Sequence, residues 1–359
     1  MDPAHAHLDL TAVGPKPYSG DFLDWAGWIM AWRQDRSEEA VEGVKLGVAM
    51  SQGTGVGWVG DIAGSDEAVQ AFVRSGMEGV SFIECFGLGS RQSDAIDNMR
   101  RRLAELNDSL DGAYDLCHVG IQPHAPYSAG AALFDAATTV AAQSDLPLCT
   151  HLAETPEELQ FVRDAAGPLA DRLRSWGKGE ETIKGSGLHV IDWLRPQLAR
   201  RPWLLAHCNY VDDQHIRVLS DCGASVAYCP VAGDYFGHPP DGHRYRQMLA
   251  AGVNVCLGTD SILCQPAEQE QPLGIMAQMR HVYRRDGGGT DLARTLLKMA
   301  TANGLKALGL DPAPAALKPG TPARLAGVRF DPGDSADPLT QALENDYPVE
   351  SIVDPQMQE

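Results

Sequence analysis

Eight short apolar runs, each followed by a longer helix-prone stretch, most constrain the fold of this 359-residue chain. Such alternation is typical of βα units, in which successive strands lie parallel in one sheet. Eight units predict an α/β fold of the (β/α)8 TIM-barrel type, which reaches this length as a single domain. The predicted strands are Pro3–Leu8, Gly55–Ile62, Gly79–Phe86, Leu116–Gln122, Leu146–Leu152, Trp203–Cys208, Ser225–Cys229 and Val253–Gly258. The clearest predicted helices are Asp21–Asp35, Ser93–Leu110, Ala131–Gln143, Pro156–Asp164, Asp212–Cys222 and Tyr245–Gly252.

Composition and charge limit the partners of the chain. Hydrophobic residues make up 44% and charged residues 21%, which provides for a large core and argues against disorder. The net charge of -19 disfavours a nucleic acid or an anionic membrane as partner and leaves a small-molecule substrate open. The eight cysteines include no Cys-x-x-Cys pair, so we interpret them as buried reduced thiols of a cytoplasmic protein. No apolar run reaches the ~18 residues of a membrane span.

Polar side chains gather where the predicted strands end, and parallel barrels collect their catalytic residues at the carboxyl ends of strands. Three imidazoles and a carboxylate among them suit one catalytic divalent metal with an open position for water. A fourth histidine and a glutamate remain to move protons. The pattern predicts a metal-dependent hydrolase. The six residues are His5, His7, His151, Glu154, His207 and Asp260, and a further histidine, His124, also lies just beyond a predicted strand.

Two short motifs carry most of this prediction. His5 and His7 share one face of an extended strand because side chains alternate along it, although alone they also fit two surface histidines near the terminus. His151 is followed three residues later by Glu154, which places an acid/base beside a ligand at a strand tip. Zinc lowers the pKa of bound water toward ~7, so Glu154 is placed to take its proton and pass it to a leaving nitrogen.

The other candidates have a structural alternative each. His207 fits a metal ligand, a hydrogen-bond donor next to the metal, or a core histidine, and Asp260 fits a metal ligand or a helix N-cap.

Two-metal hydrolases of this architecture often use a carbamylated lysine at the fourth strand, and residues 120–128 contain no lysine, which favours one metal. Gly55–Gly60 matches Gly-x-Gly-x-x-Gly, but it lies inside a β-prone run, so we interpret it as a glycine-rich strand rather than a dinucleotide site.

Taken together, the motifs resemble the amidohydrolase superfamily, and within it the cytosine deaminase/chlorohydrolase-like aminohydrolases. Their order and spacing cover roughly Pro3 to Leu310. Residues Glu154–Leu159 and Cys229–His238 look most similar to aminodeoxyfutalosine deaminases. The matching motifs are Ala4–Leu8, Pro123–Ser128, Thr150–Thr155, Ala206–Cys208, Tyr228–Pro230 and Leu257–Ser261.

The resemblance implies a role for each candidate. Glu154 would carry the proton from water to the departing amine, and His207 would polarise the attacking hydroxide or steady the tetrahedral intermediate. His124 and Glu84 would face the substrate, although Glu84 also fits a buried or rim carboxylate without a catalytic role. One Zn²⁺, or Fe²⁺ as in some members, would be bound by His5, His7, His151 and Asp260.

The implied reaction is hydrolytic deamination of an aminated heterocycle. The favoured substrate is the 6-amino group of an adenine nucleoside such as aminodeoxyfutalosine, in a menaquinone route. The same residues would serve a hydrolase that removes chloride or an alkylamine from a triazine-like ring. From another class, a barrel that only binds partners would also keep this fold. Barrels of this type often form dimers, and that analogy allows a homodimer.

Two departures from the family pattern stand out. Relatives carry several dozen residues before the first metal motif, and these form half of a small β-sandwich. Here only the C-terminal share, Leu317–Gly327, is found, so either the start is misassigned or the small domain is vestigial. We therefore expect a barrel over 1–311, and partial β-sandwich strands with a poorly ordered acidic tail over 312–359. Val231–Gly233 stands where relatives carry a basic residue and a serine, which leaves the exact substrate open.

Overall fold

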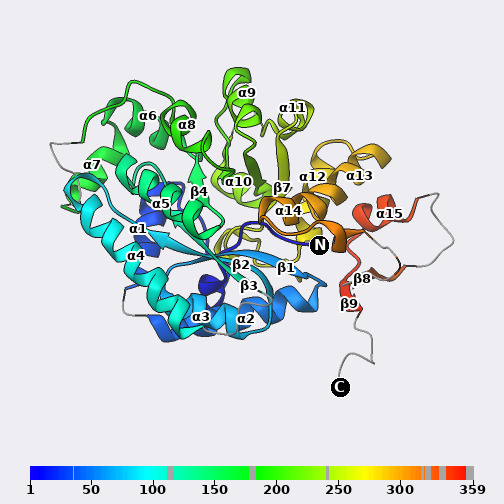
Figure 1. The fold of residues 1–359 in the computed structure, drawn as a ribbon. Helices are drawn as coiled ribbons and strands as arrows, with labels where there is room; N and C mark the ends of the chain where they lie inside the picture. Colours follow the sequence, from blue (N-terminus) through cyan, green and yellow to red (C-terminus); the bar gives the residue numbers. More distant parts are fainter. Residues whose placement is uncertain are drawn as a thin grey trace.

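Seven parallel strands form the centre of the molecule in a computed structural model (Figure 1). The model describes residues 1–34, 36–110, 117–177, 183–239, 242–316, 319, 325–330 and 337–352. Hydrogen bonds join the strands in the orders β1-β2-β3 and β4-β5-β6-β7. The strands are β1 (Trp58–Ala63), β2 (Glu78–Cys85), β3 (Cys117–Pro123), β4 (Cys149–Leu152), β5 (Leu204–His207), β6 (Ser225–Tyr228) and β7 (Asn254–Leu257).

Single bridges join the two groups of strands into a ring. Ile121 of β3 pairs with Leu148 just before β4, and Ala6 pairs with both Asp61 of β1 and Asp260 just after β7. The N-terminal segment therefore takes the eighth position, and the predicted barrel is confirmed. The extended segment at this position ends before Leu8, where the sequence predicts a strand over Pro3–Leu8. It ends there because the Leu8 N–H donates to the Asp61 carboxylate (3.1 Å) and a 3-10 helix begins at Leu8.

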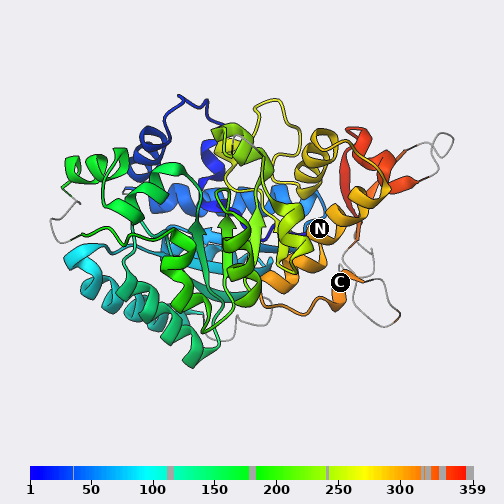
Figure 2. The same cartoon turned by 90° about the horizontal axis from the view of Figure 1, so that it is seen from above.

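Helices surround this ring on its outer side (Figures 1 and 2). The six predicted helices are all present, with ends shifted by a few residues at most. Their starts follow local chemistry: Thr155 caps α6 by accepting from the Glu158 N–H, with Pro156 in the first turn. Among the described residues, none of the helices is long and apolar enough to span a membrane. The helices are α1 (Phe22–Trp32), α2 (Ser37–Gly53), α3 (Asp66–Arg74), α4 (Gln92–Ser109), α5 (Ala131–Ser144), α6 (Pro156–Asp164), α7 (Pro168–Ser175), α8 (Val190–Leu198), α9 (Asp213–Asp221), α10 (Pro230–Phe236), α11 (Tyr245–Ala250), α12 (Ile275–Arg285), α13 (Thr290–Met299), α14 (Ala302–Ala307) and α15 (Pro338–Glu344).

Strand alternation decides which side chains enter the barrel. Val80 and Phe82 of β2 pack in a small interior cluster, and the same face of β2 carries Glu84 two residues further on. Cys149 of β4 belongs to that cluster as well, and His151 follows it by two. All eight cysteines are unpaired, and the interpretation as buried thiols is confirmed for seven of them but not for Cys222, which is partly exposed.

Gly60 allows the N-terminal segment to lie directly on β1. Its N–H donates to the Pro3 carbonyl and its carbonyl accepts from the Ala6 N–H, both at 2.9 Å. A Cβ at this position would lie 2.2 Å from the Ala4 carbonyl oxygen. The glycine-rich run is thus part of a strand, as the sequence predicts, and its glycine permits close backbone approach.

We therefore expect Gly60→Ala to push the segment that carries His5 and His7 away from β1. Overpacking of this kind costs about 1–3 kcal/mol, so the melting temperature and the metal content should both fall. Gly53→Ala, at the end of α2 with nothing within 4 Å of the added Cβ, is the matched control. Thermal unfolding and elemental analysis check the prediction, and an unchanged melting temperature in Gly60→Ala contradicts it.

Among the described C-terminal residues, 325–330 and 337–352 contain two strands and a helix, which is more regular structure than the sequence predicts for them. The strands β8 (Leu325–Val328) and β9 (Val349–Ile352) pair antiparallel, and α15 packs against α12 and α13 at one edge of the barrel (Figure 2). Arg280 donates to the Ala342 carbonyl (3.0 Å) and the Tyr347 carbonyl (2.6 Å), and Leu343 is fully buried. Most of Leu317–Gly327 lies outside the described residues, so the β-sandwich remnant and the division at 311/312 stay predictions.

Candidate metal centre and active site

Three of the predicted metal ligands form a buried cluster at the carboxyl ends of the strands. Nitrogen atoms of His5, His7 and His151 lie within 4.8 Å of one another. His5 is fully buried, and neither of its ring nitrogens has a hydrogen-bond partner among the described residues. Leaving a buried polar atom unpartnered is costly, and coordination of a cation would satisfy one of these nitrogens. The cluster therefore fits a metal ion.

Asp260 completes the predicted ligand set. Its Oδ1 lies 3.6 Å from His7 Nε2, which lies 3.4 Å from His151 Nε2. Burial raises the pKa of Asp260 to about 7, and burial together with the neighbouring imidazoles lowers the pKa of His5 and His7 well below the usual value. The histidines are thus held neutral, which is the form that binds metal. Three imidazoles and one carboxylate suit zinc or iron.

A backbone contact fixes the ring orientation of His151 in the cluster, and another side chain holds the backbone of His207. His151 donates from Nδ1 to the His124 carbonyl (3.0 Å), which leaves Nε2 facing His7. His243 donates from Nε2 to the His207 carbonyl (2.8 Å). His207 and Asp260 both have left-handed backbone angles, with φ of 71° and 56°. Such conformations persist only where the surroundings enforce them, and they are concentrated at functional sites.

Glu154 lies beside His207 at the carboxyl ends of the strands. The distance from Glu154 Oε1 to His207 Nε2 is 3.6 Å, and both side chains are buried. Burial, aided by the charges of Asp260 and Glu158, raises the pKa of Glu154 well above its usual range. Glu158 accepts from the Glu154 N–H (2.8 Å), and Asn209 donates to the Glu154 carbonyl (3.1 Å). The backbone of Glu154 is therefore held in place, and the raised pKa of its carboxyl group favours a group that both takes up and releases a proton.

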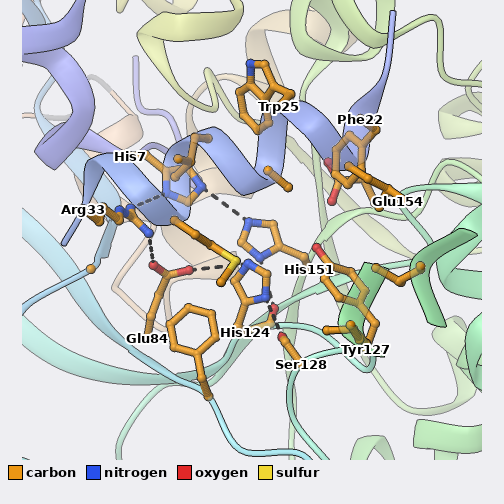
Figure 3. Close-up of a pocket in the computed structure, with 18 of the residues that line it drawn as sticks. His7, Phe22, Trp25, Arg33, Glu84, His124, Tyr127, Ser128, His151 and Glu154 are labelled. Carbon is orange, nitrogen blue, oxygen red and sulfur yellow. Dashed lines mark hydrogen bonds and ion pairs between the residues drawn. The ribbon is translucent and has the colours of Figure 1, made fainter. Parts of the chain in front are cut away.

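His124 and Glu84, which are predicted to face the substrate, lie next to His151 on the side away from Glu154 (Figure 3). His124 Nδ1 is hydrogen-bonded to Ser128 Oγ (2.7 Å), and its Nε2 is 3.8 Å from Glu84 Oε1. Burial lowers the pKa of His124 to about 3, although Glu84 opposes this shift. The cluster thus presents a neutral imidazole to the cavity next to a carboxylate.

An arginine that the sequence analysis did not single out fixes Glu84. Arg33, directly after α1, forms ion pairs with Glu84 and with Asp9 (2.9 Å to Asp9 Oδ2). Burial opposes ionisation of Glu84, but Arg33, His124 and His151 outweigh it and lower the pKa of this carboxyl. One oxygen of Glu84 is therefore committed to Arg33, and the other faces His124. No motif in the sequence signals these long-range pairs.

A cavity of about 500 Å³ opens over these residues. Its inner end is lined by His7, His151, Glu154, His207 and Asp260, and its outer walls come largely from α1 and α7. This volume is within the range of small-molecule sites, and the combination of apolar walls with a few convergent polar groups is typical of them. The cation ligands, the proton carrier and the binding space are thus in one place.

A parallel barrel with a histidine-rich centre at its strand ends defines the class of metal-dependent barrel hydrolases. The chain matches the amidohydrolase family over residues 4–353 and belongs to that family. The assignment to hydrolases, predicted from the sequence, is thereby confirmed at the level of the family.

Curated relatives carry deaminase names. A 5-methylthioadenosine/S-adenosylhomocysteine deaminase of Dictyoglomus thermophilum is 26% identical, over 86% of this chain and 67% of its own length. An aminodeoxyfutalosine deaminase of Deinococcus radiodurans is 29% identical, over 72% of this chain and 62% of its own length. The chain thus spans about two thirds of these relatives or less.

Solved structures share the fold. The aminofutalosine deaminase of Helicobacter pylori in complex with methylthio-coformycin superposes with a TM-score of 0.79 and 20% identity, covering 95% of this chain and 80% of the other. An atrazine chlorohydrolase of Arthrobacter aurescens complexed with zinc superposes with a TM-score of 0.73 and 18% identity, covering 96% of this chain and 78% of the other. At these identities the likeness concerns the fold alone.

Proposed function

We propose that this protein is a hydrolytic deaminase that removes the 6-amino group of an adenine nucleoside. The observation that carries the proposal is the Glu154–His207 pair next to the histidine cluster, inside a cavity of about 500 Å³. The names of the relatives support an adenine nucleoside, and aminodeoxyfutalosine, of a menaquinone route, is the favoured member of this class.

Metal binding, proton transfer and substrate contact are assigned to different residues. One divalent ion, Zn²⁺ or Fe²⁺, held by His5, His7, His151 and Asp260, would lower the pKa of water so that it acts as a nucleophile near neutral pH.

Glu154 takes the proton from this water and delivers it to the amino group, which leaves as ammonia. His207, whose Nε2 lies 3.6 Å from Glu154 Oε1, would polarise the attacking water or stabilise the tetrahedral intermediate. His124 and Glu84 contact the substrate, with Glu84 kept ionised by Arg33. The eight unpaired thiols support a cytoplasmic location.

Ammonia release by the zinc-loaded protein tests the proposal. The panel holds aminodeoxyfutalosine, adenosine, 5'-methylthioadenosine, S-adenosylhomocysteine, guanine, cytosine and a chlorotriazine, with chloride release followed for the last. We expect turnover of at least one adenine nucleoside and none of cytosine. One bound metal per chain without turnover of any adenine nucleoside contradicts the proposal, and chloride release alone favours the triazine alternative.

A further inference from the structure

A second group of ligand atoms lies in the same cavity, beside the histidine cluster. Glu84, His124 and His151 each offer one such atom, and these atoms all lie within 4.8 Å of one another. Glu84 is buried near the end of β2, and His124 follows β3 directly. Both side chains line the cavity, and Figure 3 shows Glu84 between Arg33 and His124.

Hydrogen bonds decide which nitrogen of His124 carries the proton. The Ser128 hydroxyl donates to the Ala125 carbonyl (3.1 Å), so Ser128 Oγ is left to accept from His124 Nδ1 (2.7 Å). Burial lowers the pKa of His124 to about 3, so the ring is neutral and carries only this one proton. The other nitrogen, Nε2, therefore presents a lone pair to the space in front of it.

The atom that faces this lone pair is a second acceptor. Glu84 Oε1 lies 3.8 Å from His124 Nε2, is buried, and has no hydrogen-bond partner among the described residues. Two acceptors that face each other without a hydrogen between them repel, and a buried polar atom without a partner is costly. A cation between the two atoms would satisfy both of them.

The spacing of the two acceptors suits a single divalent ion. Zinc binds imidazole nitrogen at ~2.0–2.1 Å and carboxylate oxygen at ~2.0–2.2 Å, so two ligand atoms at a tetrahedral angle lie about 3.4 Å apart. The 3.8 Å between Glu84 Oε1 and His124 Nε2 is close to this value. It is also similar to the 3.6 Å between His7 Nε2 and Asp260 Oδ1 in the first cluster.

The charges around Glu84 leave it able to attract a cation. Arg33 pairs with Glu84 Oε2 and with Asp9 Oδ2, so one guanidinium is shared between two carboxylates. With both carboxylates ionised, these three side chains together carry one negative charge. The guanidinium also holds Glu84 by one oxygen only, which leaves Oε1 directed at His124.

We propose that Glu84 and His124 bind a second divalent cation of the Zn²⁺ type, and that this ion inhibits the enzyme by excluding the substrate. Water completes its coordination, because His151 donates from Nδ1 to the His124 carbonyl and turns Nε2 toward His7. With two protein ligands and a like charge nearby, the second ion binds more weakly than the first and appears only when zinc exceeds what the first centre takes up. The binding of the ion is independent of the proposed function, whereas the inhibition rests on it.

Equilibrium dialysis against rising free Zn²⁺, followed by elemental analysis, tests the second ion. The wild type should reach one ion per chain first and two at higher free zinc. Glu84→Gln, which removes the charge, and His124→Asn, whose amide keeps the donor to Ser128 but not the second nitrogen, should both stop at one. A wild type that stays at one ion overturns the inference without any variant, and so do variants that still reach two.

His281→Gln is the matched control for zinc bound elsewhere. His281 and Asp234 form an imidazole–carboxylate pair (2.6 Å) that lines a different cavity. This variant should still bind two ions. Loss of the second ion in His281→Gln, with two ions retained in His124→Asn, places that ion at the other pair and overturns the inference.

Kinetics test the exclusion of substrate. At a free zinc concentration that half-fills the second site, KM for a deaminated nucleoside should double while kcat stays unchanged. Zinc that lowers kcat and leaves KM unchanged overturns inhibition at this site. If no nucleoside is deaminated, the proposed function fails, and the dialysis still decides whether Glu84 and His124 bind the second ion.

Discussion

Glu154→Gln should lower kcat by about 10²–10⁴-fold while leaving one metal per chain. Glutamine keeps the size of the side chain and an oxygen acceptor, but it cannot take a proton from water and return it to a leaving amine. General acid–base catalysis by one positioned group contributes a factor of this size. The Glu154 carboxyl lies 3.6 Å from His207 and is not one of the clustered nitrogen ligands. Metal content by elemental analysis and ammonia release are measured on the same preparation.

The control for this variant is Glu67→Gln, which changes an exposed glutamate in the first turn of α3 on the outer side of the barrel. It should retain both turnover and metal. Turnover within threefold of wild type in Glu154→Gln refutes the proton-transfer role. Loss of the metal together with activity would instead assign Glu154 to the holding of the ion.

The barrel is predicted from the sequence because short apolar runs of strand length alternate with longer helix-prone stretches along the chain. It also places His151 and Glu154 correctly at the tip of a strand, because parallel strands in a barrel all end at one face. The first strand is the exception. The apolar pattern of this segment predicts extended backbone through Leu8, but the Leu8 N–H donates to the Asp61 carboxylate and the chain changes direction there. A contact across 53 residues leaves no local signal in either segment.

The same reason explains what is missing from the predicted site. Arg33 is part of a predicted helix, and only the fold brings it to Glu84, 51 residues away, and to Asp9. The outer walls of the cavity have no motif either, since Trp25 of α1 and Trp176 directly after α7 are brought to the same cavity only by the fold. The order of residues 337–352 likewise depends on Arg280 of α12, which satisfies carbonyl groups in that segment.

His7→Gln should abolish stable metal binding and lower turnover by about 10³-fold or more. His7 Nε2 lies 3.4 Å from His151 Nε2 and 3.6 Å from Asp260 Oδ1, so it faces both of its predicted fellow ligands. Glutamine has no imidazole nitrogen to offer a cation. A ligand that binds only the folded state, at 100 times its Kd, stabilises a protein by about 2.7 kcal/mol. Zinc should therefore raise the melting temperature of the wild type and leave that of the variant unchanged.

His118→Gln is the matched control for this prediction, because His118 is an exposed histidine on β3. It should keep the zinc-dependent rise in melting temperature and full turnover. A wild-type zinc response in His7→Gln would remove His7 from the ligand set. The variants of Glu154 and His7 are most informative together, because the first is expected to lose turnover with the metal retained and the second to lose both. Only that combination separates holding the ion from moving the proton, and it would assign these two tasks to different residues of one buried cluster.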